Sequence, residues 1–176
     1  MNKKNKYENL INNLKNWDEN QLSTVLGRII PLLRENANDT DLLKYQRAIY
    51  DEFQYRLDKN KKGVRPELGI LGICGYHVGN QSKDKKYRRQ ILDYIVLSEL
   101  PKIGSPVYMD EWGLPNSSKR MEKLIRVLSF LKKEKSAINY KQFEKAIIEW
   151  GEDLEYIKRK FSLQWVIIDW FIFYFQ

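Results

Sequence analysis

The chain has 176 residues, 43% hydrophobic and 13% aromatic, and a formal net charge of +8. Its aromatic content excludes an intrinsically disordered chain, and its length predicts one domain with a sizeable core. One cysteine excludes an internal disulfide framework, and the basic opening segment lacks the unbroken apolar run of a secretory signal, so we expect a cytoplasmic protein.

Three segments in the first third of the chain have helical periodicity. Their apolar residues recur at spacings of three and four, which predicts helices over residues 7–17, 19–35 and 41–61. Asp18 is placed to cap the second helix, and Pro31 is expected to kink it because proline removes an interior hydrogen bond. Gly63 and Pro66 end the third helix. Residues 1–63 are therefore expected to form a helical unit.

Residues 68–79, LGILGICGYHVG, contain four glycines. Glycine is unfavourable inside a helix, so we expect a short helix that breaks near Gly75. The missing side chains favour close approach of a neighbouring backbone. The segment lacks the GK[ST] ending of a phosphate-binding loop.

The densest group of cations opens a predicted helix at residues 83–97. Five basic side chains fall within seven residues, with one tyrosine among them: Lys83, Lys85, Lys86, Tyr87, Arg88 and Arg89. The helix dipole disfavours cations at a helix start, which favours a functional role over a simple solvated face. We expect the cations to contact phosphates and Tyr87 to stack on unpaired bases.

Residues 103–116 contain two prolines and two glycines, so a connector with little regular helix is expected there. Trp112 is expected to hold this connector on the core and to find a hydrogen-bond partner for its indole N–H. A helix follows, with an apolar stripe that begins at Met121. Its neighbouring face carries three further predicted phosphate contacts, Lys119, Lys123 and Arg126.

The most regular apolar periodicity lies in residues 140–161, which predicts a long helix that begins after a cap at Asn139. Away from its apolar seam this helix carries an acidic run, Glu149, Glu152, Asp153 and Glu155. Such a run is typical of a solvated face. Contact with a basic partner, or with the basic helix of the same chain, is the alternative.

The tail, residues 163–175, is apolar on all sides apart from two residues. It is shorter than the ~20 residues that a membrane-spanning helix needs. Burial in the core, an interface with another copy or another protein, and interfacial membrane contact remain open, with membrane contact the least favoured. The residues expected at an interface are Trp165, Trp170, Phe171 and Phe173.

Few side chains are suited to catalysis or metal binding. Cys74 and His77 have the spacing of half a zinc site, but the sequence has no second Cys or His to complete it. Asp110 and Glu111 would suit a metal-dependent nuclease, although neighbouring acids arise by chance in a chain with 23 of them. We therefore expect no catalytic residue, metal or cofactor, and favour a non-enzymatic protein.

Together these patterns predict an all-α, single-domain bundle of about six helices, with the tail docked on the core or at an interface. We divide it into residues 1–63, a basic middle at 64–139, and the long helix and tail at 140–176. Residues 64–139 hold 14 basic and 8 acidic side chains, a surplus that attracts polyanions. The alternative is an ordinary solvated surface of a lysine-rich protein.

We therefore expect a non-catalytic accessory protein that binds DNA or RNA. The alternative is an adaptor or inhibitory subunit of a bacterial complex that docks through its aromatic tail to a protein partner or a second copy. The nucleic-acid hypothesis requires that the two cationic groups converge on one surface and that the acids of residues 149–155 leave them free.

Overall fold

The computed structural model describes residues 9–59, 66–82 and 84–174, with side chains described up to residue 161. The described residues form helices, turns and loops without a strand, so the predicted all-α fold is confirmed. In chain order the elements are η1 (Leu14–Asn16), α2 (Glu19–Glu35), α3 (Thr40–Lys59), α4 (Gly69–Ile73), η2 (Gly79–Gln81), α5 (Lys85–Leu97), α6 (Pro106–Trp112) and α7 (Ser118–Tyr174).

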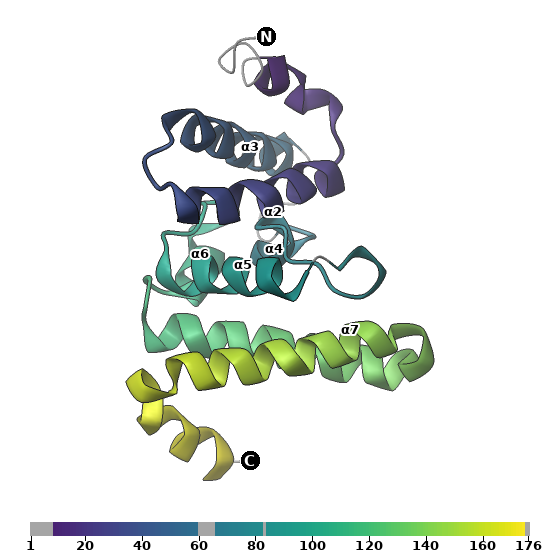
Figure 1. Ribbon diagram of the computed structural model, residues 1–176, viewed down its shortest axis with the longest axis vertical. Coiled ribbons are helices and arrows are strands. Elements are labelled where there is room, and N and C mark those ends of the chain that lie inside the picture. Colours follow the sequence, from purple (N-terminus) through teal and green to yellow (C-terminus); the bar gives the residue numbers. More distant parts are fainter. Residues whose placement is uncertain (1–8, 60–65, 83, 175–176) are drawn as a thin grey trace.

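The helices are stacked in layers along the long axis of the molecule (Figure 1). Helix α2 packs against α3 on one side and against α4 and α5 on the other, and α5 in turn packs against α7. Helix α3 lies towards one end of the stack, and α7 forms the opposite end (Figure 1). Helix α2 thus lies between α3, which follows it in the chain, and the later helices α4 and α5.

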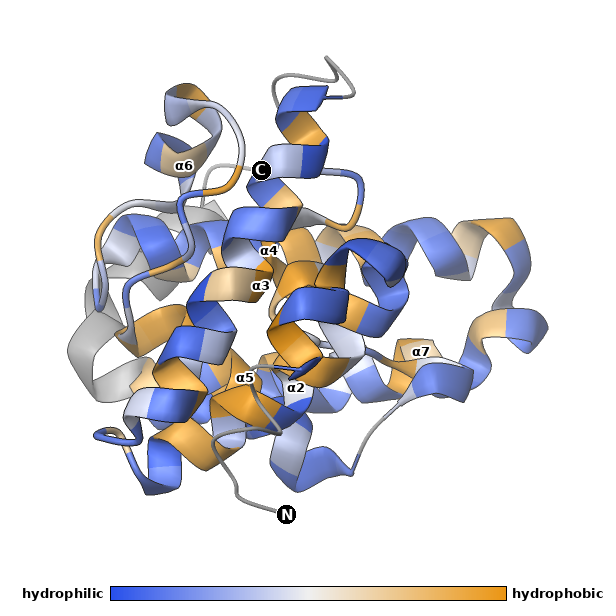
Figure 2. Ribbon diagram, turned by 90° about the horizontal axis from the view of Figure 1, so that it is seen from above, coloured by the Kyte–Doolittle hydropathy of each residue, from blue (hydrophilic) through white to orange (hydrophobic). Residues whose placement is uncertain are grey.

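Two apolar clusters hold the layers together, and α2 contributes to both. Leu26 of α2 packs with Ile49 and Phe53 of α3 in one cluster, whereas Ile30 packs with residues of α4, α5 and α7 in the other. Figure 2 shows the hydrophobic stretches gathered inside the stack and the hydrophilic ones on its outer turns. As predicted, Asp18 caps α2, in a capping box with Gln21.

Helix α4 ends where a glycine packs directly on α2. Gly75 has a φ of +80°, and a Cβ built on it would lie 2.6 Å from the carbonyl oxygen of Ser23 and closer still to Gly27. Only glycine fits this conformation and this contact without strain. The predicted helix break and the close backbone approach are both confirmed.

The connector at residues 103–116 contains a helix that was not predicted. Ser105 caps α6 by accepting a hydrogen bond from the Tyr108 amide at 3.1 Å, and Pro106 occupies the first helical position. Proline fits there because that amide has no partner within a helix. Trp112 is buried as predicted, but its indole nitrogen has no hydrogen-bond partner among the described residues, so that expectation was wrong.

Helix α7 folds back on itself, so that two arms lie side by side (Figure 1). The Lys132 ammonium lies 3.2 Å from a Cβ built on Gly151, although a straight helix would separate these residues by about 28 Å. The side chain of Asn139 accepts a hydrogen bond from the Gln142 amide at 3.1 Å, which confirms the predicted cap. We call residues 118–138 the first arm and residues 140–161 the second arm.

Both arms contribute to one apolar cluster beneath α5. The residues that the two arms contribute are all buried. They are Met121, Leu124, Leu128, Ile147, Trp150, Leu154, Ile157 and Phe161.

Within the described residues, no helix is both long enough and apolar enough to cross a membrane.

Candidate interaction surfaces

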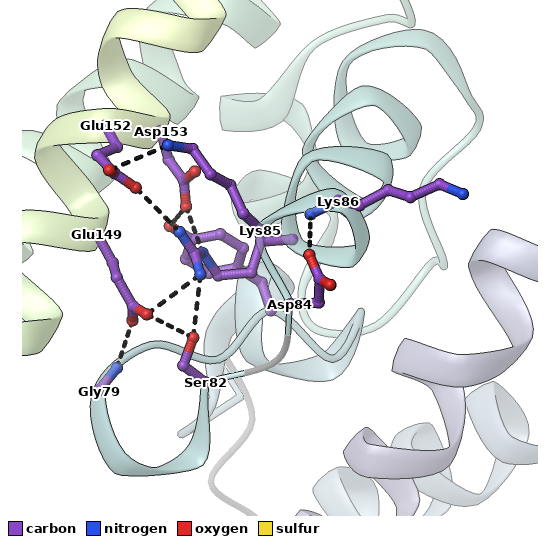
Figure 3. A network of polar contacts seen from close by, with 10 residues as sticks. Gly79, Ser82, Asp84, Lys85, Lys86, Glu149, Glu152 and Asp153 are labelled. Atoms are coloured by element: carbon purple, nitrogen blue, oxygen red, sulfur yellow. Dashed lines mark hydrogen bonds and ion pairs between the residues drawn. The ribbon is translucent and has the colours of Figure 1, made fainter.

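The cations at the start of α5 are largely held by the second arm of α7 (Figure 3). Lys83 lies outside the described residues. The Lys85 ammonium lies 3.0 Å from a carboxylate oxygen of Glu152. Arg88 is only 3% exposed. Lys86 and Tyr87 remain on the surface, and Asp84 caps the helix by accepting from the Lys86 amide at 2.8 Å.

Arg88 is the centre of a network that joins α5 to α7. Its Nε donates to Asp153 Oδ2 at 2.8 Å, and its Nη1 lies 3.2 Å from Glu149 Oε1. Its Nη2 lies 3.6 Å from Glu152. Tyr76 donates to the same Asp153 oxygen at 2.8 Å. The acidic run of α7 therefore contacts the basic helix of its own chain, one of the alternatives that the sequence left open.

The electrostatic surroundings keep Arg88 charged although it is buried. Burial lowers its pKa, but the hydrogen bond and the charge of Asp153 raise it, and the net direction is above the ordinary value. Glu149 is anchored as well, since it accepts from the Gly79 amide and from the Ser82 hydroxyl, both at 2.7 Å. We therefore leave Arg88 out of any surface that contacts phosphates.

Arg89 is committed to a different contact. Its guanidinium lies 4.5 Å from the centre of the Tyr156 ring in the second arm, a cation–π geometry. Of the six residues predicted around the start of α5, Lys86 and Tyr87 are the two described ones that face solvent without an ion pair or ring contact to the described chain.

The second group of predicted contacts lies at the start of α7 and is also paired. Lys119 lies 2.8 Å from Asp110, and Lys123 forms an ion pair with Glu111. Arg126 lies 3.8 Å from Glu122. Exposed pairs of this kind contribute about 0–1 kcal/mol each. Asp110 and Glu111 are thus surface partners of lysines.

The two cationic groups lie at opposite ends of α5. Buried Arg120, next to Lys119, donates to the carbonyls of Ile95 at 2.7 Å and Ser98 at 3.1 Å, at the C-terminal end of α5. Lys85 begins the same helix, about 18 Å away along its axis. The helix therefore does not bring Lys119 and Lys123 into one patch with Lys85.

A hollow of about 340 Å³ opens between α2, α3 and α5, and sequence reasoning missed it. Its apolar lining includes Ile30, Leu33, Leu43 and Leu97, and its polar lining includes Arg34, Gln46, Asp93, Tyr94 and Ser98. Leu43 and Leu97 are 41% and 44% exposed, although both are large aliphatic side chains.

Asp93 joins three helices at the edge of this hollow. It is buried, forms an ion pair with Arg34 of α2, and accepts from the Lys160 ammonium of α7 at 2.5 Å. The Tyr156 hydroxyl donates to Asp93 Oδ1 at 2.9 Å. A charged residue in an apolar helical stretch was the available signal: Asp93 follows Leu92 within a buried part of α5.

Cys74 and His77 are not arranged as a nucleophilic pair. Cys74 is fully buried, and burial raises the pKa of its thiol to about 12. The His77 Nε2 atom lies 2.9 Å from the Ser23 hydroxyl. Among the described residues, no group of three or more His, Cys, Asp or Glu side chains is placed to hold a metal ion.

The Cys74 thiol is expected to make stability fall in alkali. Its pKa is about 12 in the folded chain against an ordinary value of 9.0. When the pH exceeds the ordinary pKa of the thiol, the unfolded chain loses this proton while the folded chain keeps it. The free energy of unfolding therefore falls by about 1.4 kcal/mol per pH unit. Urea denaturation between about pH 7 and pH 11 measures the slope. Cys74→Ala should show a shallower decrease, and equal slopes would contradict the assignment.

The side chains of Trp165, Trp170, Phe171 and Phe173 lie outside the described part of the chain, so their role at an interface stays a prediction.

In comparisons with known proteins, no protein family, no curated protein and no solved structure matches this chain.

Proposed function

We propose that this protein is a cytoplasmic, non-catalytic interaction module, an adaptor or inhibitory subunit, that docks a partner protein over the hollow between α2, α3 and α5. The observation that carries the proposal is the rim of this hollow, where Leu43 and Leu97 expose large aliphatic side chains beside a concave surface. Concave apolar surfaces with a few convergent polar groups are typical of binding sites in proteins.

Two of the side chains predicted to contact phosphates are paired with acids of the same chain, which supports a protein partner over nucleic acid. Arg88 is buried against Asp153, and Lys85 is paired with Glu152. Turning Arg88 toward a phosphate would leave the Asp153 carboxylate buried without its cation, which costs about 3–5 kcal/mol. A phosphate contact by Arg88 would therefore weaken the packing of α7 on α5.

Nucleic-acid binding remains the second candidate because of the outer face of the first arm. Arg126, Phe130 and Lys133 recur there at spacings of four and three, and all three are exposed. Lys141 and Lys145 of the second arm are exposed as well. A face that alternates cations with an aromatic ring is suited to single-stranded nucleic acid.

Affinity purification from cells that produce the protein distinguishes the two functions. With nuclease present throughout, we expect the wild type to retain one specific protein, and Leu43→Glu/Leu97→Glu to lose it, because two carboxylates at the rim oppose an apolar contact. Leu114→Glu changes an exposed leucine outside the hollow and should retain the partner. If the wild type retained material only when nuclease is omitted, the result would instead favour nucleic-acid binding.

A further inference from the structure

We infer that the partner inserts an acidic segment into the hollow, in which a leucine-sized side chain lies next to a carboxylate. This inference rests on the proposed function, because it names the chemistry that the same hollow recognises.

The shape and lining of the hollow select the apolar part of this segment. Its volume of about 340 Å³ is near the lower end of the ~300–1,000 Å³ of ligand-binding clefts. Ile30 and Leu33 are buried and line it from α2, while Leu43 and Leu97 stand at its rim. One or two aliphatic side chains therefore suit the space better than a large rigid ring system.

The charges at its edge select the carboxylate. Arg34 and Lys160 both bind the Asp93 carboxylate, so this trio has one more positive than negative charge. The Arg34 side chain lines the hollow and is 40% exposed. A guanidinium has five N–H donors, and within the described residues Arg34 forms one ion pair, with Asp93. Donors therefore remain for a carboxylate of the partner.

Among the residues that line the hollow, a basic segment would find one carboxylate, that of Asp93, and it is already paired. Asp93 is 3% exposed and is already engaged by Tyr156 in addition to its two cations. A partner lysine would have to displace one of these donors and would meet Arg34 at the mouth. The local electrostatics therefore favour an acidic partner over a basic one.

Nuclear magnetic resonance titration of the full 21.1 kDa chain, labelled with ¹⁵N, tests the inference. The probes are two doubly capped tetrapeptides, Ala-Leu-Glu-Ala and Ala-Leu-Gln-Ala, which differ only in the carboxylate. We expect saturable shifts at the amides of Leu33, Leu43, Leu97 and Ser98. The Glu peptide should bind about tenfold more tightly, which corresponds to one charge-assisted contact of about 1.4 kcal/mol.

Two variants locate the effect. Arg34→Gln should remove most of the preference for the Glu peptide, while Lys160 and Tyr156 still hold Asp93. Leu97→Glu should weaken both peptides, whereas Leu114→Glu should leave both unchanged. If Arg34→Gln does not fold, the comparison of the two peptides on the wild type decides alone. A third probe, a short oligothymidylate, tests nucleic acid at the same amides.

Three results would overturn the inference: no saturable shift with either peptide, equal affinity for both peptides, or stronger shifts at the hollow with the oligothymidylate. These failures are separable from failure of the proposed function. A protein that is retained in the presence of nuclease and lost in Leu43→Glu/Leu97→Glu would still support docking at the hollow, with a partner of different chemistry.

Discussion

Arg88→Met is expected to lower the free energy of unfolding by about 3–5 kcal/mol, because it leaves a buried carboxylate without its cation. Asp153 is 0% exposed, and its Oδ1 atom already lacks a hydrogen-bond partner among the described residues. Among the described residues of the network around Arg88, Tyr76 alone would still donate to this carboxylate. For a chain of this length the loss corresponds to about 10 °C in Tm, measurable by thermal and urea denaturation.

Two further variants show whether the lost charge pair is the cause. In Arg88→Met/Asp153→Leu both charges are replaced by apolar groups, so most of the stability should return. Lys86→Met changes an exposed neighbour whose ammonium makes no ion pair with the described chain, and it should shift stability by less than about 0.5 kcal/mol. If Arg88→Met were as stable as Lys86→Met, the network would not be what fastens α7 to α5.

Gly75→Ala is expected to destabilise the protein by about 2–6 kcal/mol, from backbone strain and from overpacking together. The residue has a φ of +80°, which L side chains rarely adopt, and the added methyl group would meet the backbone of α2 at Ser23 and Gly27. Neither contact is the end of a flexible side chain, so α2 and α4 would have to separate. Chemical denaturation compares the variant with the wild type.

Gly151→Ala is the matched control for this substitution. Gly151 lies inside the second arm without a positive φ, and the nearest atom to its added methyl group is the Lys132 ammonium, which can move. Alanine is favoured over glycine within a helix by up to about 1 kcal/mol. We therefore expect unchanged or higher stability. A loss at Gly151 equal to that at Gly75 would show that the close approach between α2 and α4 is not the decisive feature.

Sequence patterns predicted correctly the features that depend on residues close together in the chain. The side chain of Asp18 reaches an amide three residues ahead of it, and so does that of Asn139. The break at Gly75 follows from glycine within a short apolar segment. The helix at Pro106 was missed because proline was read as a breaker, although after a capping serine it is well suited to begin a helix.

The candidate sites depended on contacts that no local pattern contains. The sequence determined the helices, their apolar faces and the surplus of cations in residues 64–139. The tertiary structure decided that Arg88 meets Asp153, 65 positions later, and that Arg34 and Asp93 meet beside an apolar hollow. The physical reason is that periodicity specifies which face of a helix is apolar, whereas the partner of a charge depends on which helices become neighbours when the chain packs.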